Sequence, residues 1–272
     1  MDTLNKLIHD AEHKWLNSLS SVCHELLQDQ NLPSHDHRHH FRVWIFIKEL
    51  LHFLDTYSEI KFDYHFIEGL IIAAFFHDTG MRGNRGVKHG KISRGLCEKY
   101  FSENNVITPL LYQQILDAIE HHDDKEYKDK KDVVLSKPTL LTILNAADDL
   151  DAFGYTGIVR YAEIYLLRGI LVKELKENVI LNAQKRFDHF ASAFSNFPSM
   201  VEKYRKKFDI LIGFYQSLYK NEKNILIINN IKENLAKGTC DELSQLIEPV
   251  IPGLTEFKES LKNESEFRYP IT

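Results

Sequence analysis

Apolar side chains recur at three- and four-residue intervals along most of the chain, and the alternation of a half-buried strand is hard to find. The pattern therefore predicts an all-α protein. The first helix is expected from about Leu4 to Leu27, and it should stop near Pro33 because the residue before a proline is pushed out of the α region. A second helix is expected to follow, with Ser34 or Asp36 as its N-cap.

The stretch from Phe66 to Phe76 is apolar on nearly every side, with Glu68 as its only charge. Such a segment is typical of a helix that other helices enclose. It runs directly into His77 and Asp78, so polar groups are expected at the buried end of this helix. A loop rich in glycine and basic residues follows, and the next helix is expected to begin near His89.

Other histidines also lie on apolar stripes. In the second predicted helix, His39 is one turn before Val43, the first residue of the inward stripe. A later helix, expected over about 109–122, has a stripe that ends at His122, with His121 beside it. We therefore expect imidazoles from several helices to point toward the core.

A further predicted helix, from Pro138 to about Phe153, carries three acids near its end. By helical register Asp148 and Asp151 share a face with leucines, whereas Asp149 lies on another face. Only Asp148 and Asp151 are therefore expected to point inward.

Beyond Gly157 the apolar period predicts more amphipathic helices. The domain organisation that we expect is a helical core with its N-terminal helix over 1–180, C-terminal helices packed on that core over 181–252, and a charged tail over 253–272 that is partly ordered at most. The additional helices are expected at roughly 158–178, 182–197, 199–219, 222–236 and 241–247.

The inward-facing ionisable residues need a common partner. A buried imidazole or carboxylate without one is costly, and a cation can serve several of them at once. The pattern therefore indicates a metal enzyme. The residues concerned are His39, His77, Asp78, His89, His121, His122 and Asp148.

Composition narrows the class of protein. The chain has 272 residues, of which 43% are hydrophobic and 27% charged, enough for a substantial core. A net charge of −5 without a long basic stripe argues against nucleic acid as the main partner. The longest apolar run is far shorter than the roughly 20 residues that span a bilayer, and no signal-peptide core is seen. Three cysteines without a CxxC pair fit thiols used as core residues in a reducing cytoplasm, so a cytoplasmic protein without a membrane partner is expected.

The ordered set His, His-Asp, His, His, Asp carries a family resemblance. Its local strings are SHDHRHHFRV at 34–43, AAFFHDTG at 73–80, EHHDD at 120–124 and AADDLDAFG at 146–154. Together they resemble the HD-domain metal-dependent phosphohydrolase superfamily, and the first string looks like its bacterial subgroup of small stand-alone hydrolases. The resemblance covers about 33–161, and a weaker likeness continues to about 220. It implies an HD-domain helical bundle with additional C-terminal helices.

The resemblance also implies roles for the site residues. His39, His77, Asp78 and Asp148 match the four ligands of a primary metal. In some branches of the family a second ion is held with Asp78 as the bridge, and the matching positions here are His89 and either His121 or His122. Imidazole and carboxylate ligands without thiolates suit manganese, iron or zinc, and magnesium if waters complete the shell. One or two ions are compatible with the sequence.

Hydrolysis of a phosphate ester or anhydride follows from such a centre, because a divalent cation lowers the pKa of a bound water from about 15.7 toward about 7. Asp78, Asp151 and His89 are the predicted catalytic residues, and Asp151 could orient the water or hold the other nitrogen of a ligand histidine. A phosphorylated small molecule, favoured to be a nucleotide, is the expected substrate. The residues predicted to bind its phosphate oxygens are Arg42, Arg82, Arg85 and Lys88, with Lys91 or Arg94 as further candidates.

The sequence is also compatible with other roles for these residues. His89 could cap its helix, His121 and His122 could end one, Arg42 could pair with a core carboxylate, and the basic loop could be solvated. Similar HD proteins bind two irons and oxygenate small alcohols or phosphonates. A metal-binding regulatory module without turnover is a third function class. An exposed apolar stripe on a C-terminal helix could also join two copies of the chain into a homo-oligomer.

Overall fold

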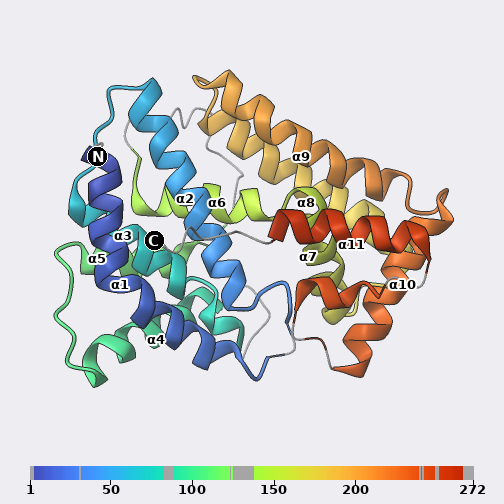
Figure 1. Cartoon of the computed structure of the whole chain (residues 1–272), viewed down its shortest axis with the longest axis horizontal. Helices are drawn as coiled ribbons and strands as arrows, with labels where there is room; N and C mark the ends of the chain where they lie inside the picture. The colour runs from blue at the N-terminus through green and yellow to red at the C-terminus, as the bar shows by residue number, and fades with distance from the viewer. Residues whose placement is uncertain are drawn as a thin grey trace. The chain divides into compact units, whose positions relative to one another are not determined.

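The computed structural model describes residues 3–30, 32–82, 89–122, 124, 138–238, 240, 242–248 and 251–265. These residues form α-helices and two short 3-10 helices, with no strand among them, which confirms the predicted all-α fold. Figure 1 shows the chain coloured from its N-terminus to its C-terminus. None of the helices in these described stretches has the length and apolar character needed to cross a bilayer.

The chain divides into two compact units. The first consists of Met1–Asp29 and Asp36–Leu150, and the second of Gln30–His35 and Asp151–Thr272. We expected a domain boundary near residue 180, but that position lies inside the continuous helix α8, and the units meet in sequence between Leu150 and Asp151. The first unit contains α1 (Thr3–Leu27), α2 (His37–Tyr57), α3 (Tyr64–Phe76), η1 (Thr79–Arg82), α4 (His89–Glu103), α5 (Tyr112–His121) and α6 (Leu140–Asp151) except its last residue.

Helix α3 is the centre of the first unit. Every residue from Ile67 to Phe76 is buried, and α1, α2, α4 and α5 all pack against this helix. The prediction of an enclosed helix is therefore confirmed. Each large apolar side chain buried here contributes about 1.5–3 kcal/mol relative to exposure, so α3 is firmly anchored in the unit.

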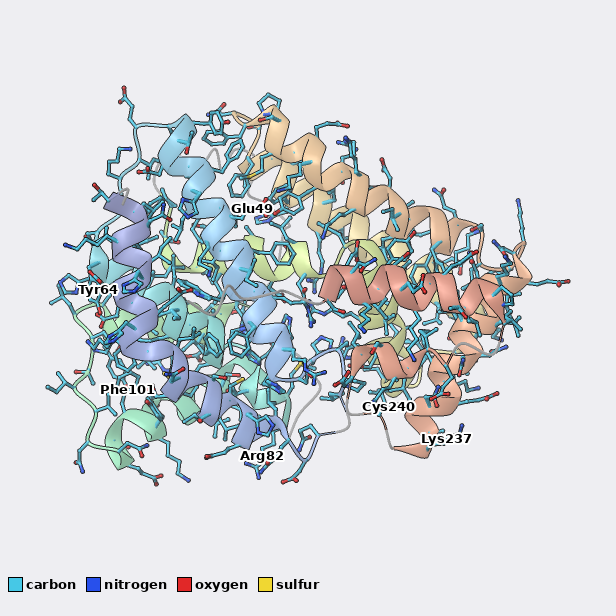
Figure 2. All side chains as sticks on the ribbon, viewed as in Figure 1. Glu49, Tyr64, Arg82, Phe101, Lys237 and Cys240 are labelled. Atoms are coloured by element: carbon cyan, nitrogen blue, oxygen red, sulfur yellow. The ribbon has the colours of Figure 1, made fainter. Side chains whose placement is uncertain are left out.

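Helix α3 carries one buried charge, and α1 neutralises it. The Glu68 carboxylate accepts hydrogen bonds from Lys14 Nζ at 2.7 Å and from Trp15 Nε1 at 2.9 Å. Burial alone would raise the pKa of Glu68, but these two donors outweigh it and lower the pKa. Trp15 also packs against Phe101 of α4, which is labelled in Figure 2.

Helix α2 begins where the sequence predicts. Asp36 is its N-cap, and the carboxylate accepts hydrogen bonds from the backbone N–H groups of Arg38 and His39. Because the cap fixes the first turn, it also fixes the direction in which His39 leaves the helix.

Helix α6 corrects the expectation that only two of its three acids point inward. Asp149 is fully buried, as Asp148 and Asp151 nearly are. The reason is that α6 has no solvent face near its end, since Ala147 and Leu150 are buried on other sides of the same turn. Helical register separates the faces of a helix, but it does not show how many of them are covered.

The second unit contains α7 (Gly154–Leu167) and α8 (Val172–Ala193), whereas helices were expected over 158–178 and 182–197, so the break between them lies earlier than predicted. The break lies at Gly169, whose φ of 81° a glycine adopts without strain. The apolar period continues across this break, so the pattern alone did not reveal it. The unit also contains α9 (Pro198–Gln216), α10 (Glu222–Lys237), η2 (Leu243–Leu246) and α11 (Pro252–Ser265).

Helix α11 lies within the segment expected to be partly ordered at most. Its buried residues Leu254, Phe257 and Leu261 form a short stripe, and the helix packs on α7. Phe257 contacts the Tyr155 ring edge-on at 5.3 Å between centroids. The stripe has only three apolar residues among many charged ones, so the sequence pattern did not predict the helix.

All three cysteines are free and buried, as expected for thiols that serve as core residues. Burial raises the pKa of the Cys23 thiol well above its usual value, and the same cause raises that of Cys97. Neither thiol has the thiolate character of a nucleophile.

We predict that Leu261→Ala lowers the free energy of unfolding by about 2–5 kcal/mol, because it removes a fully buried side chain from the contact between α11 and α7. The matched control is Glu259→Ala on the exposed face of the same helix, with an expected change within about 0.5 kcal/mol. Urea unfolding followed by circular dichroism measures both. Equal stabilities of the two variants would show that α11 is not docked.

Candidate metal centre

Six side chains from α2, the residues after α3, α4, the end of α5 and α6 converge inside the first unit. Among the described residues they form two groups of possible metal ligands whose donor atoms all lie within 4.8 Å of one another. The first donor group is His39, His77, Asp78 and Asp148, and the second donor group is Asp78, His89 and His122. All six residues are buried, with exposed fractions between 0% and 6%.

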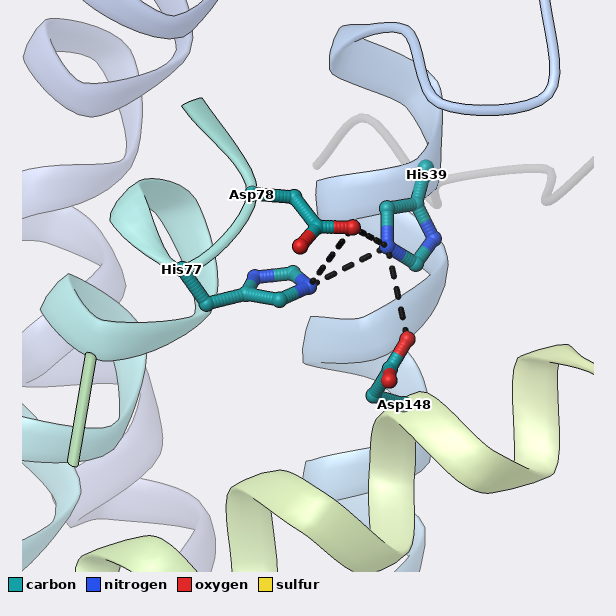
Figure 3. A group of neighbouring side chains, drawn as sticks. All are labelled: His39, His77, Asp78 and Asp148. Carbon is teal, nitrogen blue, oxygen red and sulfur yellow. Dashed lines mark hydrogen bonds and ion pairs between the residues drawn. The ribbon is translucent and has the colours of Figure 1, made fainter. Parts of the chain in front are cut away.

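The first donor group is centred on His39 Nε2, as Figure 3 shows. This atom lies 3.1 Å from His77 Nε2, 3.3 Å from Asp78 Oδ2 and 3.6 Å from Asp148 Oδ1. Two ligands about 2.1 Å from one ion are themselves about 3.0 Å apart at a right angle and about 3.4 Å apart at a tetrahedral angle. The separations from His77 and Asp78 fall in this range, and the separation from Asp148 is slightly longer.

The second donor group uses the other oxygen of the same carboxylate. Asp78 Oδ1 lies 3.0 Å from His89 Nε2 and 2.9 Å from His122 Nε2, and the two nitrogens are 3.1 Å apart. Asp78 therefore turns Oδ2 toward one set of imidazoles and Oδ1 toward the other. This is the arrangement that a carboxylate needs in order to join two cations.

The backbone sets the tautomers of two imidazoles. His77 Nδ1 lies 2.8 Å from the Ala74 carbonyl oxygen, and His122 Nδ1 lies 2.7 Å from that of Ile119. A carbonyl oxygen only accepts, so in each ring Nδ1 carries the hydrogen and the neutral ring presents a lone pair at Nε2. Both lone pairs point at other acceptors, including Asp78. Acceptors that face one another repel unless a cation lies between them, so the donor chemistry fits a metal ion.

Burial and the neighbouring side chains together set the charges of His77 and Asp78. Desolvation lowers the pKa of His77 to about 3, which leaves a neutral ring near pH 7. Desolvation would raise the pKa of Asp78, but the imidazoles of His77, His122 and His39 outweigh it and hold that pKa well below its usual range. A neutral imidazole and an ionised carboxylate are the forms that ligate metals.

Two glycines allow the second donor group to form. A Cβ on Gly80, just after Asp78, would lie 2.1 Å from the backbone oxygen of His89, and one on Gly90 would lie 2.3 Å from that of Glu120. Any larger residue at these positions would push α4 away from η1 and from α5. The Gly80 N–H also donates to Ser93 Oγ at 2.8 Å, which ties η1 to α4.

The structure distinguishes His122 from His121. The His122 side chain is 2% exposed and reaches Asp78, whereas His121 is exposed and its Nδ1 pairs with Asp124 at 2.7 Å. The assignment of His121 as a possible ligand is therefore corrected. Consecutive helical residues point about 100° apart, so only one of the two can continue the buried stripe.

His39 belongs to a donor group, whereas the neighbouring histidines His37 and His40 make other contacts. His37 is half-buried with its ring 4.7 Å from that of His24, and His40 Nδ1 donates to the Ala74 carbonyl oxygen at 2.9 Å. Neither belongs to a donor group within the described part of the chain. His40 and His77 share the same carbonyl acceptor, so His40 helps to fix the backbone that orients His77.

Asp151 was expected to act at the metal centre. It is absent from both donor groups, and its Oδ2 accepts a hydrogen bond from Arg160 Nη1 at 2.6 Å. Arg160 and Glu163, one turn apart on α7, belong to a buried polar network that the sequence reasoning missed. The available signal was the presence of two charged residues inside the apolar stretch 158–164.

The residues expected to bind phosphate differ in their settings. Arg82 is exposed at the end of η1 and is labelled in Figure 2, whereas Arg42 is 2% exposed. Burial raises the pKa of Asp36, and the charge of Arg42 opposes this effect, so Arg42 acts on a core carboxylate. Arg94 pairs with Glu98, Asp117 and Glu120 at 2.7–3.1 Å, and its role as a phosphate contact stays a prediction. Arg85 and Lys88 lie outside the described residues.

Comparison with known proteins identifies one family. Residues 37–152 match the family model of the HD domain, a range that contains all six residues of the two donor groups. HD domains bind divalent metals, and the His and Asp residues here could hold one. No curated protein and no solved structure shows a significant match to the chain.

We predict that His122→Ala reduces the bound metal from two ions to one per chain, because the second donor group loses one of its two imidazoles. His121→Ala is the matched control and should retain both ions, since its side chain faces solvent. Elemental analysis of each variant after removal of loosely bound metal gives the stoichiometry. Loss of an ion from the His121 variant alone would reverse the assignment.

Proposed function

We propose that this chain, a member of the HD-domain superfamily, is a metal-dependent phosphohydrolase that cleaves a phosphate ester or anhydride of a nucleotide or another phosphorylated small molecule. The observation that carries the proposal is the Asp78 carboxylate, which faces a separate set of imidazoles with each of its oxygens. A cation pair held by these residues would supply Lewis acidity toward a phosphoryl oxygen and would lower the pKa of a coordinated water.

The chain's own residues have distinct tasks in this proposal. His39, His77 and Asp148 would hold one ion together with Asp78, and His89 and His122 would hold the second. The Ala74 and Ile119 carbonyl oxygens fix the tautomers of His77 and His122, so that both rings keep Nε2 free of hydrogen for ligation. Manganese, iron, zinc and magnesium all accept such nitrogen and oxygen ligands.

The net charge of the loaded centre would favour an anionic substrate. Two ions bring a formal charge of about +4 in the divalent state, whereas Asp78 and Asp148 contribute −2. The surplus positive charge would attract a phosphate group. Arg82 and Lys91, exposed on either side of residues 83–88, support the same preference, and we keep them as candidate phosphate contacts together with Arg85 and Lys88.

A dinuclear iron oxygenase would use the same six donors, so ligand identity does not separate the two activities. The identity of the bound metal and the reaction product distinguish the two activities. An oxygenase requires two irons per chain, a mixed-valence paramagnetic signal and oxygen consumption with a small alcohol or phosphonate. A hydrolase releases phosphate from nucleotides or other phosphorylated small molecules and needs no oxygen.

We predict that Asp148→Asn abolishes metal-stimulated phosphate release and weakens metal binding, while helical content is retained. Loss of partners behind a ligand costs about 10–100-fold in affinity or activity, so loss of the ligand charge itself should cost more than about 100-fold. The matched control is Asp149→Asn, which alters a neighbouring buried carboxylate that belongs to neither donor group in the described residues.

The measurement is a phosphate-release screen with manganese, iron, zinc and magnesium, run beside elemental analysis of the same samples. Full activity in the Asp148 variant would refute the site. Bound metal without phosphate release from any substrate would instead favour the oxygenase or a regulatory module.

A further inference from the structure

A buried polar network in the second unit has no place in the proposed chemistry. It consists of Ser34, His35, Asp151, Arg160 and Glu163, whose exposed fractions lie between 0% and 7%. Helix α7 supplies Arg160 and Glu163, while the other members come from the short segments that precede α2 and end α6. Five buried polar residues in one place are costly, so their mutual contacts need an explanation.

The network is a chain of hydrogen bonds that runs from Glu163 through His35 and Arg160 to Asp151. Arg160 Nη1 donates to Asp151 Oδ2 at 2.6 Å, and Arg160 Nη2 lies 3.2 Å from His35 Nε2. A guanidinium has no acceptor, so His35 Nε2 accepts and His35 Nδ1 carries the hydrogen. That nitrogen lies 3.1 Å from Glu163 Oε1, which completes the sequence of carboxylate, neutral imidazole, guanidinium and carboxylate.

Glu163 also holds the backbone before α2. Its Oε2 accepts from the Ser34 N–H at 2.8 Å, and its Oε1 accepts from Ser34 Oγ at 2.6 Å. Ser34, His35 and Glu163 do not make a nucleophilic triad, because Ser34 and Glu163 both approach His35 Nδ1 and Ser34 Oγ gives its hydrogen to Glu163. The contacts therefore fasten the chain at Ser34 and His35.

The fastened segments lead directly to two metal-ligand candidates. His35 precedes Asp36, the N-cap of α2, and lies four residues before His39. Asp151 is the last residue of α6 and lies one turn after Asp148. Arg160 bonds to both His35 and Asp151, so one guanidinium ties the entry of one ligand-bearing helix to the exit of the other.

We propose that Arg160 is a positioning residue for the first donor group, and that its two-armed contact with His35 and Asp151 sets the separation of His39 and Asp148. This inference rests on the proposed metal centre. A planar guanidinium suits the task because its donors lie in a rigid fork, whereas an ammonium is a single point of charge on a flexible stem. The two imidazoles of the second donor group, His89 of α4 and His122 at the end of α5, do not depend on this contact.

The test measures manganese binding by calorimetry in a His122→Ala background, which isolates the first donor group. Adding Arg160→Gln should weaken the remaining site about 10–100-fold, the usual effect of removing a partner that orients a ligand. In a protein with intact His122, Arg160→Gln should weaken one of two sites and leave the other unchanged. General destabilisation would weaken both in parallel, so equal losses would overturn the proposal.

The matched control is Tyr215→Phe. Tyr215 is buried in the same unit and donates to the Ile158 carbonyl oxygen of α7 at 2.8 Å, so its loss weakens the hold on α7 without removing a contact to His35 or Asp151. This variant should keep wild-type manganese affinity at both sites. A loss equal to that of Arg160→Gln would assign the effect to the packing of α7 and overturn the proposal.

If Arg160→Gln fails to fold, Arg160→Lys replaces it, because lysine keeps a positive charge opposite Asp151 but lacks the second arm. The same selective loss is expected, and unchanged affinity in the folded variant would refute the positioning role. A His122→Ala protein that binds no manganese at all would refute the metal centre itself. These two failures are therefore distinguishable.

Discussion

One carboxylate organises the centre of the first unit. Asp78 is buried among imidazoles on both sides, with Oδ2 facing His39 and Oδ1 facing His89 and His122. In water such a group would be solvated, but here imidazoles surround it, and a cation held between them would replace that solvation. The surrounding helices can be understood by how they bring these donors to Asp78. Removal of the carboxylate would leave the two donor groups without the residue that they share.

The fold delivers the donors through local features that each have a physical cause. Helix α3 is apolar on all sides and is enclosed, so the two residues that follow it emerge inside the unit. Asp36 caps α2 and thereby directs His39. Gly80 and Gly90 leave room for α4 to approach η1 and α5, which brings two further imidazoles to the same carboxylate. Rigid supports of this kind hold ligands at the spacing that a metal requires.

Much of this arrangement could be predicted from the sequence, because periodicity reports which residues share a helical face. His39 and His77 follow from that rule, and so does Asp148. The rule fails where burial depends on partners distant in sequence. Asp149 is buried because α6 is enclosed on several sides, and Arg160 contacts His35, which lies 125 residues away. The choice of His122 over His121 also needed coordinates, since a one-residue shift in the end of α5 would exchange them.

The most direct test of the account is anomalous X-ray diffraction from crystals of the manganese-loaded protein. The account predicts two peaks, one on each side of the Asp78 carboxylate, the first bounded by His39, His77 and Asp148 and the second by His89 and His122. Ions bound elsewhere, with Asp78 contacting none of them, would contradict it.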